Sequence, residues 1–168
     1  MLRYVTTNDG KVREAEEYLG DGVTALEYDY PEIQADSIEA VAAEGARAAY
    51  RHADAPVVVD DAGLFVEGFD GFPGPYSSYV EDSLGVERVG RLARREDATR
   101  ARFRCVVAYC DGDAFEASPE PVDTDDRRGR DLAAADRATA MSPEEKNAVS
   151  HRGRALASFG EWYQDRTE

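Results

Sequence analysis

The sequence predicts an α/β fold, namely a single domain with a central mixed β-sheet flanked by helices. Short apolar segments typical of strands alternate along the chain with longer amphipathic segments typical of helices, which is the pattern of an α/β protein. The chain has 168 residues, of which 42% are hydrophobic, and this is enough for one domain with a buried core. No internal repeat divides the sequence, so we expect residues 1–168 to form one domain.

The first third of the chain is predicted to supply two strands and two helices. The expected elements are strands at 2–6 and around 22–28 and helices at 9–19 and 36–52. Gly20 is suited to close the first helix, because glycine readily adopts the backbone conformation of a helix C-terminus. Asp36 and Ser37 are candidate N-caps of the second helix, whose apolar residues recur on one face.

A central strand is predicted at 56–60 (PVVVD), because this segment is apolar and ends in acidic residues, as strands that open on a site do. The elements expected next are a short strand at 64–66, a Gly- and Pro-rich loop, and a helix over 82–95. A hairpin follows, from FRCVVAYC through a turn at 111–113 to AFEAS. A last helix is expected over roughly 151–165, with Leu156, Phe159, Trp162 and Tyr163 facing the core. Residues 119–140 are polar and alanine-rich and are predicted to be irregular, and a capping box at 142–145 then starts a new helix.

The two cysteines, Cys105 and Cys110, lie in one short apolar run. Residues five apart on a strand point to opposite faces of the sheet, which argues against a mutual disulfide and a shared metal. We therefore expect two buried free thiols.

The charge balance is strongly acidic. Asp and Glu outnumber Lys and Arg by 35 to 20, a net charge of −15 that repels nucleic acid and anionic membranes. The basic residues are 18 arginines and only two lysines, Lys11 and Lys146, a composition that suggests a halophilic host with high internal salt. The N-terminus lacks the layout of a signal peptide and no apolar run has the length of a membrane span, so we expect a cytoplasmic protein.

The segment from Thr6 to Lys11 falls at a junction between strand and helix. A helix N-terminus offers unpaired N–H groups and the positive end of the helix dipole, and both favour phosphate. Lys11 would add a point charge. The alternative interpretation is a capped helix whose lysine faces the solvent.

The pair Asp60–Asp61 follows the predicted central strand. Adjacent carboxylates can bind a hard cation such as Mg²⁺, and one of them can also accept a proton from water. Glu32 is a candidate third carboxylate. The alternative is that the pair only caps the next turn.

Two further segments have a composition suited to a nucleotide. The run from Lys146 to Arg154 is basic and contains a lysine and a histidine, as a polyanionic ligand requires. The loop GFPGPYS at 71–77 holds aromatic residues between glycines and prolines and could line a base pocket, although a plain structural turn fits these residues equally well.

Together these stretches resemble the inosine triphosphate pyrophosphatase family, also called XTP/dITP diphosphatases. The family motifs T-x-N-x-x-K, V-x-D-D-[SA]-G-L, G-x-P-G-x-Y-S and M-x-x-E-E-K-N-x-x-S-H-R-x-x-A match Thr6 to Lys11, VVDDAGL, GFPGPYS and Met141 to Ala155, in the family's order. The resemblance implies Mg²⁺-dependent hydrolysis of non-standard purine nucleoside triphosphates (ITP, dITP and XTP) to the monophosphate and pyrophosphate, which cleanses the nucleotide pool. It also implies a homodimer.

The resemblance further implies a role for each matched residue. Asp61 would be the catalytic carboxylate and a Mg²⁺ ligand, with Glu32 and Asp60 as further metal ligands. The implied substrate contacts are Thr6, Thr7, Asn8, Asp9, Gly10 and Lys11 for the triphosphate, together with Ala62, Lys146, His151 and Arg152. Ala62 stands where the family more often has serine.

The chain departs from the family between the hairpin and the last motif. Members carry an aromatic F-G-Y-D-P-type segment there, whereas this chain has no Phe, Tyr or Trp between Phe115 and Met141. Either Phe72 or Tyr76 replaces the missing base platform, or the protein is a nucleotide-binding protein with impaired or no turnover. A purely structural acidic domain would leave both lysines and the Asp pair without a role.

Overall fold

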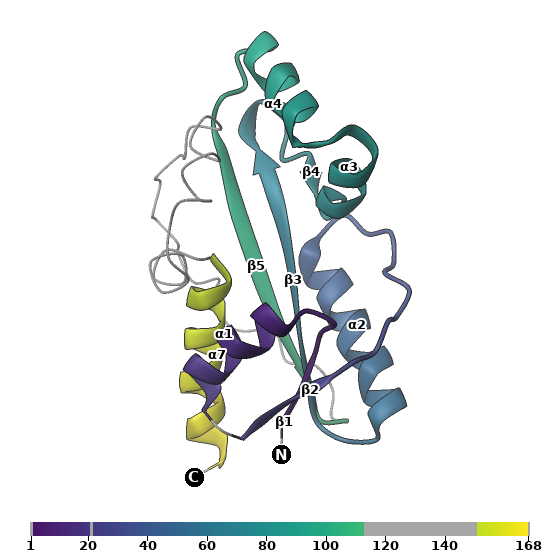
Figure 1. The fold of residues 1–168 in the computed structure, drawn as a ribbon, viewed down its shortest axis with the longest axis vertical. Helices are drawn as coiled ribbons and strands as arrows, with labels where there is room; N and C mark the ends of the chain where they lie inside the picture. The colour runs from purple at the N-terminus through teal and green to yellow at the C-terminus, as the bar shows by residue number, and fades with distance from the viewer. Residues whose placement is uncertain (1, 21, 113–150, 168) are drawn as a thin grey trace.

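The computed structural model describes residues 2–20, 22–112 and 151–167. Its elements are β1 (Leu2–Val5), α1 (Asp9–Leu19), β2 (Val23–Leu26), α2 (Ile38–Ala53), β3 (Val57–Val66), the 3₁₀ turn η1 (Glu67–Phe69), β4 (Pro73–Gly74), α3 (Ser77–Leu84), α4 (Val86–Arg95), β5 (Ala101–Cys110) and α7 (His151–Thr167). They form one α/β domain with a mixed sheet between helices, as the sequence predicts (Figure 1).

The sheet is built around β3. The strand order is β2-β1-β3-β4, with β5 pairing β3 on its other edge. β1 pairs β2 and β3 in parallel, whereas β4 and β5 run antiparallel to β3. β3 and β5 are ten residues long and continue past β1 and β2 towards α3 and α4 (Figure 1).

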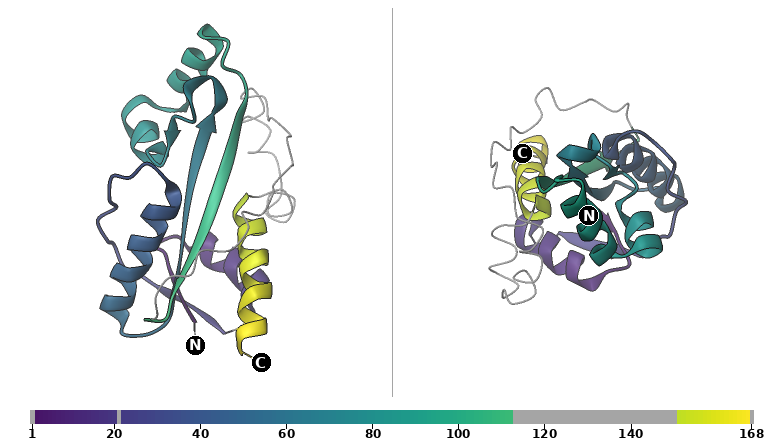
Figure 2. Two further views of the ribbon diagram at one scale, coloured as in Figure 1. Left: turned by 180° about the vertical axis from the view of Figure 1, so that it is seen from behind. Right: turned by 90° about the horizontal axis from the view of Figure 1, so that it is seen from above.

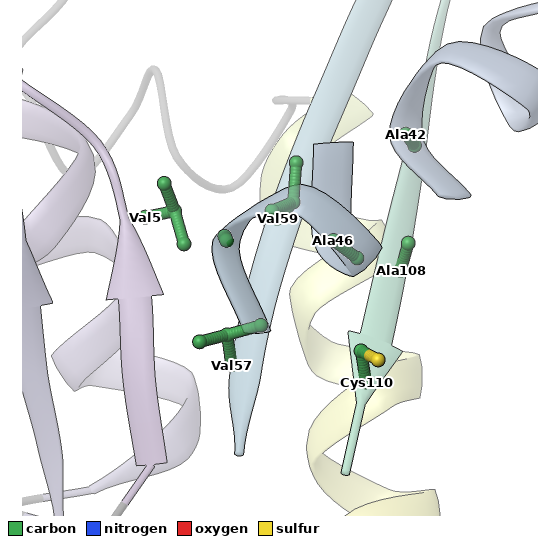
Figure 3. Close-up of a cluster of buried hydrophobic side chains, with 8 residues drawn as sticks. Val5, Ala42, Ala46, Val57, Val59, Ala108 and Cys110 are labelled. Carbon is green, nitrogen blue, oxygen red and sulfur yellow. The ribbon is translucent and has the colours of Figure 1, made fainter. Parts of the chain in front are cut away.

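Helices cover the two faces of this sheet separately. α2 packs on one face, and α1 and α7 lie on the other (Figure 2). Successive valines of β3 alternate between the two layers, because side chains alternate along a strand. Val57 and Val59 join the α2 layer, shown in Figure 3, while Val58 contacts the core beneath α1 and α7.

Local signals set the ends of the first two helices. Asn8 caps α1 by accepting a hydrogen bond from the backbone N–H of Gly10 at 2.8 Å. Gly20 follows the helix with φ +75°, a backbone conformation that suits glycine. Ser37 caps α2 by accepting from Ala40, so Ser37 is the N-cap of the two candidates.

The strands predicted at 56–60 and 64–66 are one strand. β5 pairs every residue of β3 from Val57 to Val66, so the ladder continues through Asp60 and Asp61 instead of ending there. The single helix predicted over 82–95 is also wrong. Gly85, at φ +78°, separates α3 from α4, and α3 begins earlier, at Ser77.

The last helix places its apolar residues largely as predicted. Leu156 is fully buried and Phe159 is nearly so, and Tyr163 packs against the same core. Trp162 is the exception, because it is 46% exposed while its ring contacts Tyr109. The two cysteines are free thiols on opposite faces of β5, as expected. Cys110 is buried, whereas the prediction of a buried thiol is wrong for Cys105, which is only partly buried.

Several predicted features lie outside the described residues. These are the returning strand of the hairpin, the irregular stretch 119–140, the capping box at 142–145, and Lys146. Within the described residues, no helix is long and apolar enough to cross a membrane.

Candidate active site

One edge of β3 has a gap in its pairing. β1 pairs this edge at Val57 and Val58, and β4 pairs it at Leu64 and Phe65. In the described parts of the chain, residues 59–63 have no strand partner on this edge. The chain leaves β1 beside this gap and then enters α1. The acidic pair therefore lies next to the segment from Thr6 to Lys11, as the contact of Lys11 with Asp60 shows. It does so although β3 does not end at these acids.

The two adjacent carboxylates point to opposite faces of the sheet. Asp60 shares the face of Val58, beneath α1 and α7, and contacts Lys11 and Arg152. Asp61 has the parity of Val57 and lies on the α2 face. The structure thus separates two carboxylates that the sequence grouped in one metal site.

Asp60 is a buried anion held by several donors. Its carboxylate accepts from the Tyr4 hydroxyl at 2.5 Å, from Lys11 Nζ at 3.1 and 3.3 Å, and from Arg152 Nε at 2.8 Å. Burial alone would raise the pKa of Asp60, but the charges of Lys11 and Arg152 hold it below its ordinary value. Asp60 is therefore ionised throughout the physiological pH range.

This anion gathers two cations from distant parts of the chain. Lys11 comes from α1 and Arg152 from α7, and their side chains are 29% and 21% exposed. Burial would lower the pKa of Arg152, but Asp60 raises it above its ordinary value. Both cations are thus partly buried, partly accessible and oriented by one carboxylate, as an anion-binding site requires.

The segment between β1 and α1 forms a compact turn. The N–H of Asn8 donates to Thr6 Oγ1 at 3.1 Å, and the N–H of Lys11 donates to the carbonyl of Asn8. The cap at Asn8 agrees with the structural interpretation of this motif. The position of Lys11 disagrees with that interpretation, because its ammonium group lies against Asp60 instead of facing the solvent.

Asp61 has a different environment. Its Oδ1 accepts from the N–H of Ala62 at 2.9 Å, and its Oδ2 is buried with no hydrogen-bond partner among the described residues. Burial is the main reason that the pKa of Asp61 is raised to about 6, and the negative charges of Glu32 and Asp60 add to it. Burial also raises the pKa of the Tyr30 hydroxyl, and the negative charges of Glu32, Asp61 and Asp60 raise it further.

Asp61 and Glu32 are candidate ligands of a cation. An orphaned carboxylate oxygen close to a second negative charge is costly by itself and is relieved when a cation binds. Within the described residues, no cluster of three or more His, Cys, Asp or Glu side chains could hold a metal on its own. Asp61 and Glu32 alone would leave most positions around such an ion to other ligands, and Mg²⁺ commonly takes these from water and substrate phosphates.

The loop GFPGPYS is fastened to β3 next to these acids. Ser77 Oγ accepts from the N–H of Leu64 at 2.7 Å and donates to the carbonyl of Gly74 at 2.6 Å. A Cβ on Gly63 would lie 2.3 Å from that carbonyl oxygen, so only glycine fits there. Phe72 in this loop is 49% exposed, and the choice between a base pocket and a structural turn stays open.

The structure adds three residues that the motifs did not indicate: Tyr4, Glu14 and Phe103. Tyr4 binds Asp60, and a tyrosine in an otherwise apolar buried strand is a sign that its hydroxyl has a partner. Glu14 follows Lys11 by one helical turn on α1 and contacts Arg152. Phe103 on β5 is 57% exposed and stacks on His151, with ring centroids 5.2 Å apart and 17° between the planes.

Comparison with known proteins bears on the whole chain. A model of the Ham1 family matches residues 2–123. A dITP/XTP pyrophosphatase of Thermococcus kodakarensis is 41% identical over 98% of this chain and 97% of its own length. One from Methanopyrus kandleri is 38% identical over 96% of this chain and 95% of its own.

A solved structure agrees in fold. A HAM1 protein from Coxiella burnetii superposes with a TM-score of 0.72 at 25% identity, covering 98% of this chain and 100% of its own. The alignment with the Thermococcus relative spans 179 positions, which is more than the 168 residues of this chain. That relative therefore contains residues that have no counterpart here.

Proposed function

This chain belongs to the Ham1 family, and from that premise we propose that it hydrolyses non-standard purine nucleoside triphosphates. The substrates would be dITP, XTP and ITP, and the products the monophosphate and pyrophosphate. One observation carries the proposal. Lys11 and Arg152 converge on the buried Asp60, while the unpartnered oxygen of Asp61 lies on the other side of the same strand.

The triphosphate would bind at the N-terminus of α1 and on the two cations. Helix dipole, Lys11 and Arg152 together supply positive potential in a chain whose net charge is −15. The proposed substrate contacts are those that the family motifs imply, namely Thr6, Thr7, Asn8, Asp9, Gly10, Lys11, Ala62, Lys146, His151 and Arg152. The N–H of Ala62 would have to leave the Asp61 carboxylate to contact substrate.

We assign Asp60 to a different role from the metal ligand that the sequence suggested. Its two oxygens accept hydrogen bonds from Tyr4, Lys11 and Arg152, so it acts as the fixed counter-ion of the cations. A buried anion that holds both cations in place before substrate arrives lowers the cost of organising the site. Asp60 would thus contribute to binding without touching the substrate.

Asp61 would be the general base. With its pKa near 6 it is ionised at neutral pH and still able to accept a proton from the attacking water. That water would attack the α-phosphorus, the bond from this phosphorus to the bridging oxygen would break, and pyrophosphate would leave. Lys11 and Arg152 would offset the negative charge on the leaving group.

The residues present fit a divalent metal such as Mg²⁺. Asp61, through its unpartnered oxygen, and Glu32 would hold the ion together with phosphate oxygens and water. When bound, Mg²⁺ would supply positive charge to the phosphates. We further propose that the protein works as a cytoplasmic homodimer, which sedimentation of the purified protein would test.

A second candidate is a nucleotide-binding protein with little turnover. The interval from Phe115 to Met141 lacks the aromatic residues of the family's base-recognition segment, which favours this alternative. The stacked pair of Phe103 and His151 offers the base a replacement surface, since Phe103 is exposed and His151, which is partly buried, directly precedes Arg152 in the chain.

Initial rates of pyrophosphate release decide between the two. The assay uses Mg²⁺ and molar KCl, compares ITP, XTP, dITP, GTP and ATP, and includes the variant Asp61→Asn. The proposal expects faster release from ITP, XTP and dITP and loss of at least about a hundredfold in the variant. Equal rates for all five, or an active variant, would contradict it. Nucleotide-dependent thermal stabilisation without release would favour the second candidate.

A further inference from the structure

Gly45 lies in the middle of α2, a position at which glycine is normally less favourable than alanine. The ring of Tyr30 explains its presence. A Cβ on Gly45 would lie 2.6 Å from three atoms of Tyr30, the hydroxyl oxygen among them, so a larger residue would have to displace the ring. Tyr30 therefore packs directly on the backbone of the helix, at a point where this is possible only because residue 45 has no side chain.

Tyr30 belongs to the segment 27–36, which lies between β2 and α2 and runs alongside that helix (Figures 1 and 2). The backbone of this segment makes no hydrogen bond to the backbone of another described residue. Two tyrosine rings contact α2 instead. Tyr30 packs on Gly45, and Tyr28 stacks on a ring of the same helix, that of His52, with centroids 4.1 Å apart and 9° between the planes. Side chains thus set the position of the segment.

Glu32 follows Tyr30 by two residues and is exposed. Among the described residues, no hydrogen bond or ion pair fixes its carboxylate. The residue between them is Pro31, whose ring fixes its own φ and favours an extended conformation of Tyr30, so little freedom separates the ring from Glu32. Glu32 lies close enough to Asp61 for its charge to add to the effect of burial on the pKa of that carboxyl.

We propose that Tyr30, packed on Gly45, is a positioning residue for Glu32. It keeps the Glu32 carboxylate close to Asp61 before a divalent cation binds. Two carboxylates repel each other, so without the ring the segment could carry Glu32 away from Asp61, and a cation would have to order it again at the expense of affinity. The inference rests on the proposed function, since it takes Asp61 and Glu32 as ligands of a divalent cation.

The test is the binding of Mn²⁺ alone to the nucleotide-free protein, measured from the electron paramagnetic resonance signal of the free ion. Mn²⁺ is the probe because it takes the same oxygen ligands as Mg²⁺. Gly45→Ala is expected to weaken Mn²⁺ binding about tenfold, the scale on which the loss of a group that orients a metal ligand acts. Gly90→Ala is the matched control. Its methyl group would meet only the end of the Arg94 side chain among the described residues, so it should bind Mn²⁺ as the parent does.

Variants of Tyr30 separate the position of the ring from other effects. Tyr30→Phe keeps the ring and should bind Mn²⁺ within about twofold of the parent. Tyr30→Ala should weaken binding about tenfold, as Gly45→Ala does. In the Tyr30→Ala background, Gly45→Ala should have little further effect on binding, because its methyl group no longer meets a ring.

Four results would overturn the inference: no binding of Mn²⁺ by the parent, unchanged binding by Gly45→Ala or Tyr30→Ala, an equal loss in Tyr30→Phe, or additive losses in the double variant. Parent-like binding by Glu32→Gln would do the same. If Mn²⁺ binding follows the expected pattern but no nucleotide releases pyrophosphate, the proposed function fails and the inference stands. If pyrophosphate is released but Gly45→Ala binds Mn²⁺ as the parent does, the inference fails and the proposed function stands.

Discussion

Asp60 and Asp61 are neighbours in the chain with opposite chemistry. Because side chains alternate along a strand, Asp60 lies among hydrogen-bond donors and Asp61 lies near Glu32, where its Oδ2 has no partner in the described part of the chain. The pKa of Asp60 is therefore lowered while that of Asp61 is raised. A pair of carboxylates whose pKa values are pushed apart is a common device for giving one the role of an acid or base and the other a structural role.

The metal-free protein should become less stable as pH rises through about 6, because the pKa of Asp61 is raised to that value from 3.8. A carboxyl with a raised pKa favours the fold while protonated, so its contribution is complete below 3.8 and is lost above 6. In EDTA, the melting temperature of Asp61→Asn minus that of the parent should grow from pH 4 to pH 7. A difference that does not change with pH would show that Asp61 titrates normally.

Asp60→Asn should destabilise the fold by roughly 3 kcal/mol, because removing one partner of a buried ion pair leaves the other charges uncompensated. Urea unfolding at pH 7 measures this loss in the free energy of unfolding. Glu39→Gln is the matched control, since Glu39 forms an exposed ion pair with Arg104 at 2.8 Å and should contribute less than about 1 kcal/mol. Equal effects of the two substitutions on the free energy of unfolding would mean that the ion pairs of Asp60 contribute no more to stability than an exposed ion pair does.

The helices and the strands differ in how far local sequence specifies them. α1 spans the residues predicted for it, because Asn8 and Gly20 are signals within the segment itself. The continuation of β3 through its two acids depends on pairing with β5, more than forty residues later, which no local pattern reports. The same holds for Asp60, whose donors Tyr4, Lys11, Cys105 and Arg152 come from four separate elements and could be grouped only by the fold.

Gly63→Ala tests the close contact between β3 and β4. The new methyl group would lie 2.3 Å from the carbonyl oxygen of Gly74, so a loss of about 2 kcal/mol in the free energy of unfolding is expected. Gly90→Ala in α4 is the control with the opposite sign. Its methyl group would meet only the end of the Arg94 side chain among the described residues, with Nη1 at 3.6 Å and Nη2 at 4.0 Å. Alanine within a helix stabilises it by about 0.5–1 kcal/mol relative to glycine. A neutral Gly63→Ala would show that β4 is not held as described.

The whole molecule combines a net charge of −15 with a partly buried group of cations formed by Lys11 and Arg152. Composition and motif order were enough to predict the fold class and the residues around the gap in β3. They could not show that Asp60 binds cations from α1 and α7 while Asp61 lies near Glu32, nor indicate that Glu14 contacts Arg152, because both depend on how the elements pack.

Salt should stabilise the molecule, because its acidic surface repels itself. The screening length falls from about 8 Å at 0.15 M to about 3 Å at 1 M, so most of this repulsion disappears over that range. We expect the melting temperature to rise steadily between these KCl concentrations. A melting temperature that falls instead would mean that exposed ion pairs, such as Arg51 with Glu44, outweigh the repulsion.

The central claim is that Asp61 directs water at the α-phosphorus of a bound nucleoside triphosphate. Hydrolysis of ITP in water enriched in oxygen-18, followed by ³¹P spectroscopy or mass spectrometry of the products, tests it most directly. The account predicts one labelled oxygen in inosine monophosphate and none in pyrophosphate. Label in pyrophosphate, or the release of inorganic phosphate in its place, would contradict it.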